Sequence, residues 1–593
     1  MRTESGQAAA DRQGAFRLLG DYVLRDRGLL TRALLLLLLA TAADVAGPVL
    51  IKIFIDDHLL VEHFEPRALG LLFAGYLVTQ LAAAWLRYRQ TLRFSEMALG
   101  AVLDIRKRVF GHVLRLPLAF YDRAIVGQLV SRITNDTEAI KDLYVQFLSV
   151  VLTNLVLLLG IVVAMGLLDL QLMLISLLLI PSVVGVIYLY QRLSGAAVSD
   201  SRELRSDINA AVSESIGGMP VIQACNRQQA FVDRFDGLND RYYRARMRSV
   251  RAGAMLLRPA IDLLSVLVLT AVVWGFGLQV EAGVAEVGVL YAFLSYLSRF
   301  TEPLAEITQR FNLYQQAMVA GARVQQLLQE TPEHWSGGGA RIHAGAVRFA
   351  AVDFHYRPGK PVLKQLELEV PAGGFYAVVG HTGSGKSTLL NLLLNFYQPS
   401  AGTIRIDNQP LQAYSQAALR AGIGLIPQEP FVLAASVRDN IDMGRGLAFE
   451  AIQRAARQAH LHPVIESLPR RYETELGERG TRLSTGQRQQ LIIARALAGA
   501  PRILLLDEAT SSVDSETEQV VQQALAELHG EVTLIVVAHR LSTVRQADRI
   551  LVMSHGEFVE AGSHEELMRG PRGIYASMYR LQQQAHRIEA LER

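Results

Sequence analysis

Long apolar stretches fill the first half of the chain and end near residue 310. Six of them are long enough to cross a hydrocarbon core of about 30 Å as helices. They lie at 30–55, 68–88, 144–167, 171–191, 260–280 and 287–309. Pro48 and Pro303 fall inside these stretches, and helices bundled in a membrane tolerate such prolines. The pattern therefore predicts an all-α membrane domain of six transmembrane helices.

The segments between the apolar stretches differ in charge. Those at 56–66, 168–171 and 279–286 contain no Lys or Arg, whereas 87–143 and 192–258 are rich in arginine. The positive-inside rule places the basic segments and both termini in the cytoplasm, and predicts a multi-pass membrane protein. Helical periodicity in the basic segments predicts that the membrane helices continue beyond the bilayer.

Beyond the membrane domain, short aliphatic runs alternate with helical segments. Runs such as 503–506 and 533–537 are typical of buried parallel strands. We therefore expect a soluble α/β domain in this half, cytoplasmic like the termini. The predicted order is a cytoplasmic N-terminal segment (1–28), the membrane domain (29–325), a linker (326–342), the α/β domain (343–580) and a C-terminal tail (581–593).

Composition agrees with a membrane half and an aqueous half. Only 19% of the 593 residues are charged, against about 25% in a typical soluble protein. The net charge of +3 gives no bias toward polyanions, so nucleic acid is not an expected partner. Because Cys225 is the single cysteine, an internal disulfide and a cysteine-cluster metal site are excluded.

A phosphate-loop pattern, GxxxxGK[ST], follows the predicted strand 376–379. Its residues are Gly380, His381, Thr382, Gly383, Ser384, Gly385, Lys386 and Ser387, and Thr388 comes next in the following helix. Such glycines let backbone N–H groups surround the phosphates of a nucleotide, in front of the positive end of a helix. Lys386 would supply a point charge and Ser387 a hydroxyl ligand for Mg²⁺.

Two carboxylates end the aliphatic run 503–506. Asp507 would hold the Mg²⁺ shell, and Glu508 would act on the attacking water as a general base. This placement fits the edge of an open α/β sheet at which ligands bind. A structural salt bridge is the alternative for either carboxylate.

The sequence LSTGQ at 483–487 stands before an apolar helix and resembles the LSGGQ signature of ATP-binding-cassette (ABC) proteins. Thr485 stands where that family usually has glycine. Other cassette motifs are present in the family's order. Tyr356 resembles the aromatic residue that stacks on adenine, Gln428 the Q-loop glutamine, Asp514 the D-loop aspartate and His539 the switch histidine.

The resemblance implies that two cassettes close head to tail and that ATP is bound between them. Ser484, Gly486 and Gln487 would then contact the nucleotide held by a second subunit. His539 would orient the water and the γ-phosphate, and Gln428 would join the Mg²⁺ shell and the catalytic group. ATP and Mg²⁺ are the implied cofactors.

Three further segments resemble coupling elements of ABC exporters. Residues 474–480 (TELGERG) resemble the X-loop. Residues 120–136, beginning with Phe120-Tyr121-Asp122, and residues 214–223 resemble the cytoplasmic tips that touch the cassettes. Ordinary helix turns are the alternative for these two.

The resemblance covers about residues 20 to 580 and extends to bacterial MdlB-type multidrug-resistance-like half-transporters, which implies a place in the bacterial inner membrane. Residues 286–293 and 302–304, with His381 in the phosphate loop, carry this likeness. It implies ATP-driven export of drugs or other amphipathic compounds by a dimer with an MdlA-type partner. A homodimer would also supply the second phosphate loop and the second signature segment. Export of lipid or peptide, or a nucleotide-gated regulator, is the alternative. Six predicted spans exclude a soluble ABC protein.

Pointers to substrate contact are few. Asp44 lies within the first predicted span and has no basic residue within a turn. Arg299 and Glu302 are spaced to pair with each other. Phe293, Tyr296 and Phe300 share one helix face, which would either line a cavity or serve helix packing.

Overall fold

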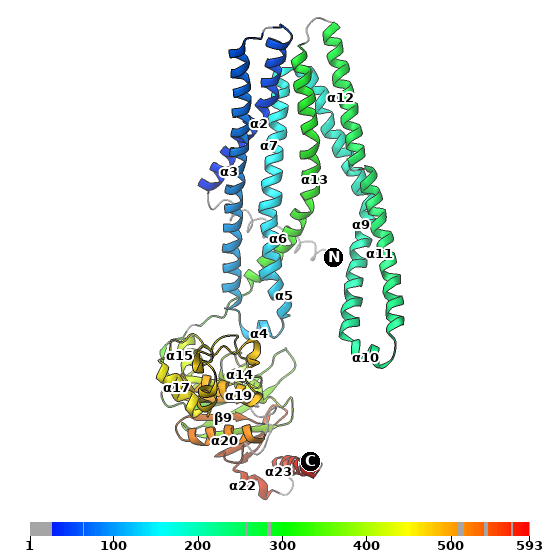
Figure 1. Cartoon of the computed structure of the whole chain (residues 1–593). Helices are drawn as coiled ribbons and strands as arrows, with labels where there is room; N and C mark the ends of the chain where they lie inside the picture. The colour runs from blue at the N-terminus through cyan, green and yellow to red at the C-terminus, as the bar shows by residue number, and fades with distance from the viewer. Residues whose placement is uncertain are drawn as a thin grey trace. The chain divides into compact units, whose positions relative to one another are not determined.

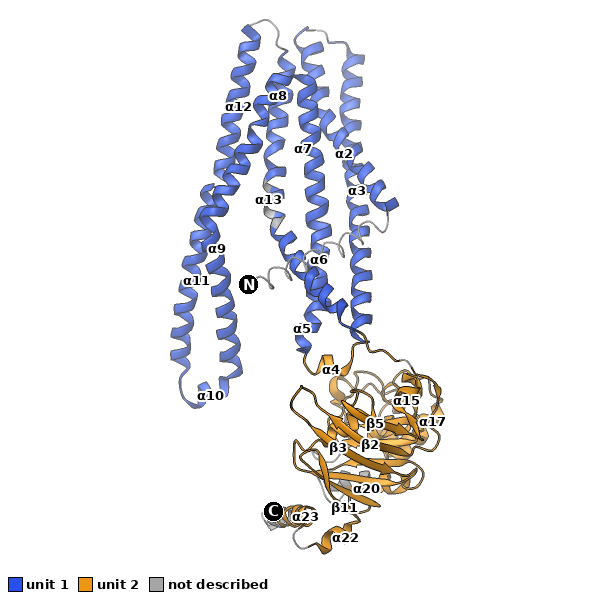
Figure 2. Cartoon of the chain, turned by 180° about the vertical axis from the view of Figure 1, so that it is seen from behind, with its two compact units in different colours: residues 1–115, 124–331 blue, residues 116–123, 332–593 orange. Residues whose placement is uncertain are grey.

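The computed structural model describes residues 27–591 apart from 63, 257, 282–285, 336, 508–514, 539–543 and 571–572. The chain forms two compact units (Figure 2). The first contains the described residues up to Arg115 and those from Ala124 to Thr331. The second contains Leu116–Arg123 and the described residues from Pro332 onward. The short segment 116–123 thus belongs to the second unit, although its chain neighbours on both sides belong to the first.

Helices build the first unit, and several of them are long (Figure 1). They are α2 (Arg27–Phe54), α3 (Pro66–Val113), α5 (Val126–Ser131), α6 (Thr137–Asp142), α7 (Ser149–Leu168), α8 (Leu170–Leu177), α9 (Leu179–Gly217), α10 (Met219–Ala224), α11 (Gln228–Leu256), α12 (Arg258–Glu281) and α13 (Val287–Gln329). Wider π-helical turns occur at η1 (Ile55–Leu59), η2 (Arg132–Asp136) and η3 (Leu143–Leu148). The 48 residues of α3 extend about 72 Å at 1.5 Å per residue, so this helix does continue beyond one membrane thickness.

Five helical segments within the described residues are long and apolar enough to cross a membrane. They are Arg27–Leu59, Pro66–Val113, Val126–Leu168, Leu170–Gly217 and Gln228–Glu281. The sixth predicted span lies in α13, whose apolar stretch is interrupted by Arg299 and Glu302. Apolar helices of this length explain the high hydrophobic content of the first half of the chain.

The core of the first unit lies where α7, α8, α9, α12 and α13 pack together. Phe293, Tyr296 and Phe300 of α13 are at most 1% exposed in this core. The Tyr296 hydroxyl donates to the Val45 carbonyl of α2 at 2.6 Å. This face of α13 therefore serves helix packing, and the cavity-lining interpretation is wrong for this structure.

Some ionisable side chains in the first unit contact partners far away in the chain. Arg87 of α3 donates to the Asp44 carboxylate of α2. Arg299 donates to the backbone carbonyl of Asp44 at 3.2 Å. Within the described residues, Arg299 thus contacts α2 and does not form the short-range pair with Glu302 that its spacing suggested.

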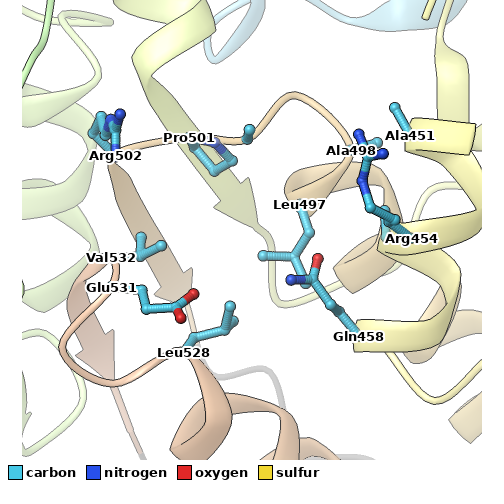
Figure 3. A pocket seen from close by; sticks show the side chains of 12 residues that line it. Ala451, Arg454, Gln458, Leu497, Ala498, Pro501, Arg502, Leu528, Glu531 and Val532 are labelled. Atoms are coloured by element: carbon cyan, nitrogen blue, oxygen red, sulfur yellow. The ribbon is translucent and has the colours of Figure 1, made fainter. Parts of the chain in front are cut away.

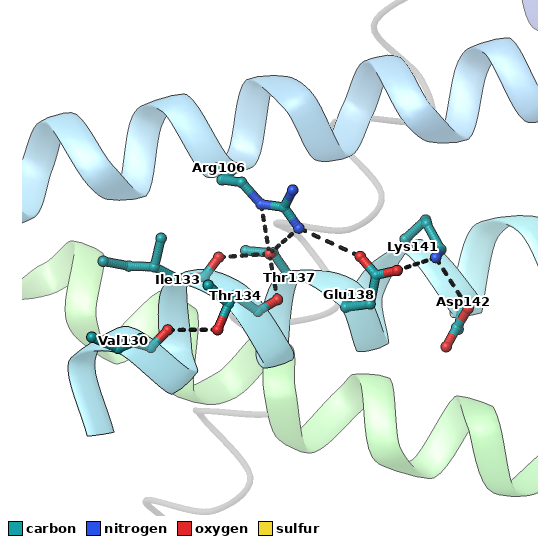
Figure 4. A network of polar contacts seen from close by, with 8 residues as sticks. All are labelled: Arg106, Val130, Ile133, Thr134, Thr137, Glu138, Lys141 and Asp142. Atoms are coloured by element: carbon teal, nitrogen blue, oxygen red, sulfur yellow. Dashed lines mark hydrogen bonds and ion pairs between the residues drawn. The ribbon is translucent and has the colours of Figure 1, made fainter. Parts of the chain in front are cut away.

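A polar network joins α3 to the η2–α6 region (Figure 4). The fully buried Thr137 hydroxyl accepts from the Arg106 guanidinium at 3.0 and 3.2 Å. Arg106 also reaches Glu138, which accepts in turn from Lys141. Because α3 ends at Val113 and α5 begins at Val126, the network ties together the two stretches of chain that flank segment 116–123.

The second unit is built on two sheets. Its main sheet has the order β11-β10-β4-β9-β8-β7, in which β10, β4, β9, β8 and β7 run parallel and β11 pairs antiparallel with β10. These strands are β4 (Phe375–Gly380), β7 (Ile423–Ile426), β8 (Ile503–Asp507), β9 (Thr533–Val537), β10 (Arg549–Ser554) and β11 (Glu557–Gly562). The smaller antiparallel sheet has the order β3-β2-β5-β6. Its strands are β2 (Val347–Phe354), β3 (Leu363–Val370), β5 (Ala401–Ile406) and β6 (Gln409–Pro410), and a short β1 (Gly338–Ala340) precedes them.

Helices cover the sheets of this unit. They are α4 (Leu118–Tyr121), α14 (Lys386–Leu393), α15 (Gln416–Gly422), α16 (Val437–Asp442), α17 (Phe449–Gln458), α18 (His462–Ser467), α19 (Thr485–Leu497), α20 (Ser515–Leu528), α22 (His564–Arg569) and α23 (Ile574–Leu591). Single 3-10 turns occur at η4 (Leu411–Ala413), η5 (Arg471–Glu473) and η6 (Glu478–Gly480). The last helix, α23, continues through most of the predicted C-terminal tail.

The strand β4 is buried along its whole length. Its alternate side chains enter two different cores: Phe375, Ala377 and Val379 pack with the helices α16 to α20, and Tyr376 and Val378 pack with the smaller sheet and α14. This period of two follows from strand geometry. A central strand held on both faces fixes the position of the loop that leaves its carboxyl end.

Candidate functional site

The phosphate loop connects β4 to α14, and two of its glycines have no room for a side chain. At Gly385 the φ angle is +109°, and an added Cβ would lie 2.7 Å from a Leu363 methyl carbon. At Gly380 a Cβ would lie 2.2 Å from the Met553 carbonyl oxygen of the neighbouring strand β10. The loop therefore needs glycine both for its conformation and for its close approach to β10.

Two polar side chains of this loop are buried. The Lys386 ammonium, 6% exposed, donates to the carbonyls of Gly380 at 2.9 Å and His381 at 3.1 Å. The Ser384 hydroxyl is buried and has no hydrogen-bond partner among the residues that the structure describes. A buried hydroxyl without a partner is costly, so this position suits a ligand with hydrogen-bonding oxygens.

Three parallel strands bring predicted site residues to one edge of the main sheet. The phosphate loop follows β4, Gln428 follows β7, and Asp507 ends β8. The Ser387 hydroxyl donates to the Asp507 carboxylate at 3.1 Å. A cavity of about 560 Å³ opens here, and its lining comprises Tyr356, Val362, Thr382, Gly383, Gly385, Lys386, Ser387, Thr388 and Gln428. Ligands of open α/β sheets bind at this edge.

The donor set at this edge fits Mg²⁺. The Ser387 hydroxyl and the Asp507 carboxylate lie in contact, and the Gln428 side chain borders the same cavity. Oxygen donors of this kind are the ligands that Mg²⁺ prefers, and the ion usually takes its remaining ligands from water and phosphate. The described residues contain no cluster of three or more His, Cys, Asp or Glu side chains suited to a metal.

Tyr356 stands at the rim of the cavity and is 46% exposed. Its hydroxyl is 3.1 Å from the Thr388 hydroxyl in α14. Its ring makes edge-to-face contacts with Phe354 and Tyr397, with centroids 4.8 and 5.0 Å away. The ring is held by these contacts and by its hydroxyl, and its half-exposed surface borders the cavity, where a flat ring system could stack. The sequence motif did not identify Tyr397, because its place beside Tyr356 depends on tertiary packing.

The signature segment begins α19 and closes on itself. The Ser484 hydroxyl accepts from the Gln487 backbone N–H at 3.2 Å, and the Gln487 side chain accepts from the Ser484 N–H at 3.0 Å. This capping box satisfies two backbone donors of the helix start. Thr485, the departure from the family pattern, is exposed, and its hydroxyl accepts from Arg488 at 3.1 Å.

The segment that follows Gln428 is bound to the signature helix. Arg495 of α19 donates to the carbonyls of Asn440 at 2.7 Å and Phe431 at 2.8 Å. Burial, with a smaller contribution from nearby Arg445, lowers the pKa of Arg495 to about 10. The guanidinium therefore remains charged at neutral pH and holds the two segments together. This link was missed from the sequence because no motif spacing reports it.

The coupling segments fall in different units. The segment 474–480 pairs with the chain after Gln428, since Leu476 N–H donates to Ala435 and Val437 N–H donates to Thr474. Phe120, Tyr121 and Asp122 lie at α4 in the second unit, whereas 214–223 lies at the tip of α9 and α10 in the first.

Three predicted site residues, Glu508, Asp514 and His539, lie outside the described residues. Glu508 follows β8 directly in the chain, and His539 comes two residues after β9. Their roles stay predictions that rest on chain position and family resemblance.

A second cavity, of about 300 Å³, lies elsewhere in this unit (Figure 3). Leu497 of α19, Arg502 before β8 and Leu528 of α20 border it. Arg502 precedes β8 and Asp507 ends it, so this cavity is at the opposite end of the strand from the motif residues. The described residues that border it include none of the predicted site residues, and we assign no chemistry to it.

Known proteins match both units. The family model described as ABC transporter transmembrane region matches residues 30–304, and the one described as ABC transporter matches residues 363–511. The multidrug resistance-like ATP-binding protein MdlB of Buchnera aphidicola subsp. Schizaphis graminum is 36% identical, over 93% of this chain and 95% of its own. The probable multidrug resistance ABC transporter ATP-binding/permease protein YheH of Bacillus subtilis is 37% identical, over 89% and 80%.

A solved structure also matches over nearly the whole length. It is a bacterial Atm1-family ABC exporter with ATP bound, with a TM-score of 0.76 and 27% identity, and the match covers 94% of this chain and 98% of that one. The predicted fold class, a membrane domain of apolar helices followed by an α/β cassette, is confirmed by these matches. The chain belongs to the ABC transporter family, as an exporter half-transporter whose multi-pass membrane domain precedes an ATPase cassette.

Proposed function

We propose that this half-transporter exports drugs or other amphipathic compounds, driven by ATP binding and hydrolysis. The observation that carries the proposal is the cavity bordered by Tyr356, Lys386, Ser387 and Gln428, on a chain whose other unit consists of long apolar helices. The names of the relatives in B. aphidicola and B. subtilis refer to multidrug resistance, which supports this substrate class. Lipid or peptide is the alternative cargo.

The phosphate loop would hold the triphosphate of ATP. Lys386 turns from its two carbonyl partners to the β- and γ-phosphates, and the Ser384 hydroxyl gains the partner that it lacks among the described residues. Tyr356 stacks on adenine with its exposed face. Thr388 holds the Tyr356 hydroxyl in place. Gly383, His381 and Thr382 complete the loop around the phosphates.

Hydrolysis would depend on the carboxyl ends of β7, β8 and β9. Ser387, Asp507 and Gln428 would hold Mg²⁺, which would neutralise charge on the phosphates. Glu508 accepts a proton from the attacking water, and His539 orients that water and the γ-phosphate. The separate placement of these roles on three strand ends is typical of sites on parallel sheets.

A second cassette is required, because each chain supplies one phosphate loop and one signature segment. Ser484, Gly486 and Gln487 would contact the nucleotide held by the other subunit. The capping box leaves the Ser484 hydroxyl proton free to donate, since the hydroxyl oxygen acts as acceptor within the helix. The resemblance to MdlB-type subunits favours a distinct MdlA-type partner, and Thr485 agrees with that choice. A homodimer is the alternative.

The protein would sit in the bacterial inner membrane with the cassette and both termini in the cytoplasm. The arginine-rich segments 87–143 and 192–258 support this orientation. Leu71, Phe73 and Trp274 are at least 70% exposed on the membrane helices, which suits contact with lipid.

Substrate-stimulated ATPase of the purified protein, across a panel of drugs, peptides and lipids, tests the substrate class. We expect stimulation by amphipathic drugs, and Glu508→Gln should retain ATP binding while turnover falls by about 1000-fold or more because the water loses its base. Stimulation by peptides or lipids alone would contradict the drug assignment. Full turnover of Glu508→Gln, in a dimer without another active cassette, would contradict the role of Glu508.

Co-expression with an MdlA-type half-transporter from the same organism, with one affinity tag on this chain, tests the partner. We expect both subunits to be recovered together. Recovery of this subunit alone, with drug-stimulated hydrolysis of its own, would establish the homodimer instead.

A further inference from the structure

Tyr397, in the loop that follows α14, contacts two functional segments at once. Its hydroxyl donates to the Asp122 carboxylate. Its ring meets Tyr356 edge-on, with centroids 5.0 Å apart and planes at 88°, and it meets Phe354 at 5.6 Å. One half-buried side chain thus lies between the proposed adenine-stacking residue and the segment 116–123.

Segment 116–123 is joined to the membrane unit at both of its ends. It belongs to the second unit, yet Arg115 before it and Ala124 after it belong to the first. Leu116 is 6% exposed, so the segment is packed as well as hydrogen-bonded. The Arg106–Thr137 contacts tie α3 to α6 on either side of it (Figure 4). The segment continues into α3 at one end and into α5 at the other. A movement of Asp122 would therefore be passed on to both helices.

The neighbouring residue in the same loop, Phe396, is linked through Arg420 to the other stretch of chain that leads into the membrane unit. The Arg420 guanidinium lies 4.7 Å from the centre of the Phe396 ring and 5.5 Å from that of Trp335. It also donates to the Leu394 carbonyl at 2.6 Å. Trp335 follows the boundary at Thr331 by four residues. The loop 394–397 is thus linked to both stretches of chain that lead into the membrane unit, directly through Asp122 and indirectly through Arg420 to Trp335.

We propose that Tyr397 is a positioning residue that couples ATP occupancy at Tyr356 to the placement of segment 116–123. The inference rests on the proposed function, since it assumes that adenine stacks on Tyr356. It adds a side-chain route by which the adenine end of the nucleotide acts on the membrane unit.

Tyr356 and Tyr397 restrain each other's orientation through their edge-to-face contact. Stacking on the exposed face of Tyr356 restricts that ring, and an edge-to-face neighbour must adopt the matching orientation. The orientation of Tyr397 in turn sets the position of its hydroxyl relative to Asp122. Coupling of this kind is reciprocal for binding free energies, so docking of segment 116–123 favours ATP by the same factor by which ATP favours docking.

The Tyr397 hydroxyl is suited to act as a permanent hydrogen-bond donor to Asp122. Burial and the bond to Asp122 both raise the pKa of Tyr397 well above its ordinary value. The phenol therefore stays protonated at every pH at which the transporter works. Its bond to a carboxylate is charge-assisted, which makes it stronger than a bond between neutral groups.

Hydrogen–deuterium exchange of the full-length protein, with ATP in Mg²⁺-free buffer to prevent turnover, tests the proposal. In the wild type we expect ATP to slow exchange at 380–388 and also at 116–123. In Tyr397→Phe, which keeps the ring, protection at 380–388 should persist while protection at 116–123 falls about tenfold, within the range of typical coupling factors. Tyr414→Phe is the matched control, because its hydroxyl donates to the Ile406 carbonyl at 2.7 Å, and it should behave as the wild type.

If Tyr397→Phe keeps the protection at 116–123, or if the wild type shows no protection there, the proposed coupling is wrong. Neither result would contradict nucleotide binding at the phosphate loop. Absence of protection at 380–388 in the wild type would instead overturn the proposed function. A second readout separates coupling from simple packing. Drug stimulation of ATPase should fall equally in Tyr397→Phe, Asp122→Asn and the double variant, with basal turnover within about twofold of wild type. Additive losses in the double variant would show that the two residues act independently.

Discussion

In the turn at 343–346, four consecutive backbone N–H groups donate to one carboxylate, that of Asp407, at 2.7 to 3.0 Å. The phosphate loop of the same cassette also offers polar groups to an anion, but it borders an open cavity. Its buried Ser384 hydroxyl has no partner among the described residues. The first segment contains its own anion, and the second is arranged to receive one from outside the chain.

The contrast separates groups that hold the cassette together from groups that bind a ligand. Asp407 joins the β5–β6 connection to the start of β2, far in sequence from its four donors. Substitution there should affect stability and leave nucleotide affinity unchanged. Substitution in the phosphate loop should do the reverse. The signature segment lies between these cases, because its capping box satisfies the helix start while its hydroxyl proton stays available.

The largest expected effect is at Lys386. Lys386→Ala removes the buried ammonium, so we expect ATP affinity to fall about 100-fold, which corresponds to about 3 kcal/mol for a charged hydrogen-bonding group. Isothermal titration with ATP measures this. Lys364→Ala is the control, since Lys364 forms only a 3.8 Å surface pair with Glu557 and its loss should leave affinity unchanged. Equal ATP affinity in the wild type, Lys386→Ala and Lys364→Ala would contradict the ligand-binding role of the phosphate loop and with it the contrast with the turn at 343–346.

At Asp407 we expect a stability effect. Asp407→Asn replaces two of four charge-assisted acceptor contacts by an amide group, and should lower the free energy of unfolding by about 2 kcal/mol. Asp353→Asn is the control, because Asp353 accepts from one backbone N–H only, that of Gln365, and should cost less than about 1 kcal/mol. Thermal unfolding measures both. An unchanged ATP affinity is part of the prediction.

The effect of Asp407 should also depend on pH. Burial raises the pKa of the Asp407 carboxyl, but the four backbone donors together lower it by more, so its net value lies below the ordinary 3.8. The carboxylate therefore stabilises the folded state fully above the unfolded-state pKa near 3.8, and this contribution is lost as pH falls through the lower folded-state value. The difference in Tm between wild type and Asp407→Asn should be constant near pH 7 and should shrink below pH 3.8.

A smaller effect is expected at the signature serine. Ser484→Ala removes a helix cap worth about 1 kcal/mol and a hydroxyl proposed to meet the partner's nucleotide, so ATPase turnover should fall about tenfold with ATP affinity unchanged. Ser563→Ala breaks a second capping box, in α22, and is the matched control. Loss of turnover in both variants would mean that capping alone matters.

The smallest effect is expected at Thr485. Thr485→Gly restores the usual residue of the family and removes the exposed contact with Arg488, at a cost of about 0.5–1 kcal/mol from glycine in a helix. Turnover should change less than about threefold, as measured in the intact dimer. A larger rise would show that Thr485 weakens the signature and would strengthen the case for two unequal ATP sites.

Local features of the structure could be predicted from the sequence, and long-range side-chain partners could not. The phosphate loop, β8 with its terminal Asp507, and the helix after Ser484 follow from patterns within a few residues. The partner of Asp44 is 43 residues away in the chain, and that of Asp122 is 275 residues away, so no spacing rule reports either. The helical period placed Phe293, Tyr296 and Phe300 on one face of α13, but packing with other helices decided that this face is buried.

The passage of the chain through the second unit at 116–123 has a consequence for recombination between related exporters. A single crossover at the 331/332 boundary would join a foreign cassette to a native segment 116–123, and Asp122 would then face whatever residue occupies position 397. A chimaera that carries 116–123 along with its own cassette would preserve the Tyr397 contact. In this protein, a module that can be exchanged intact therefore has to be made of two separate pieces of sequence.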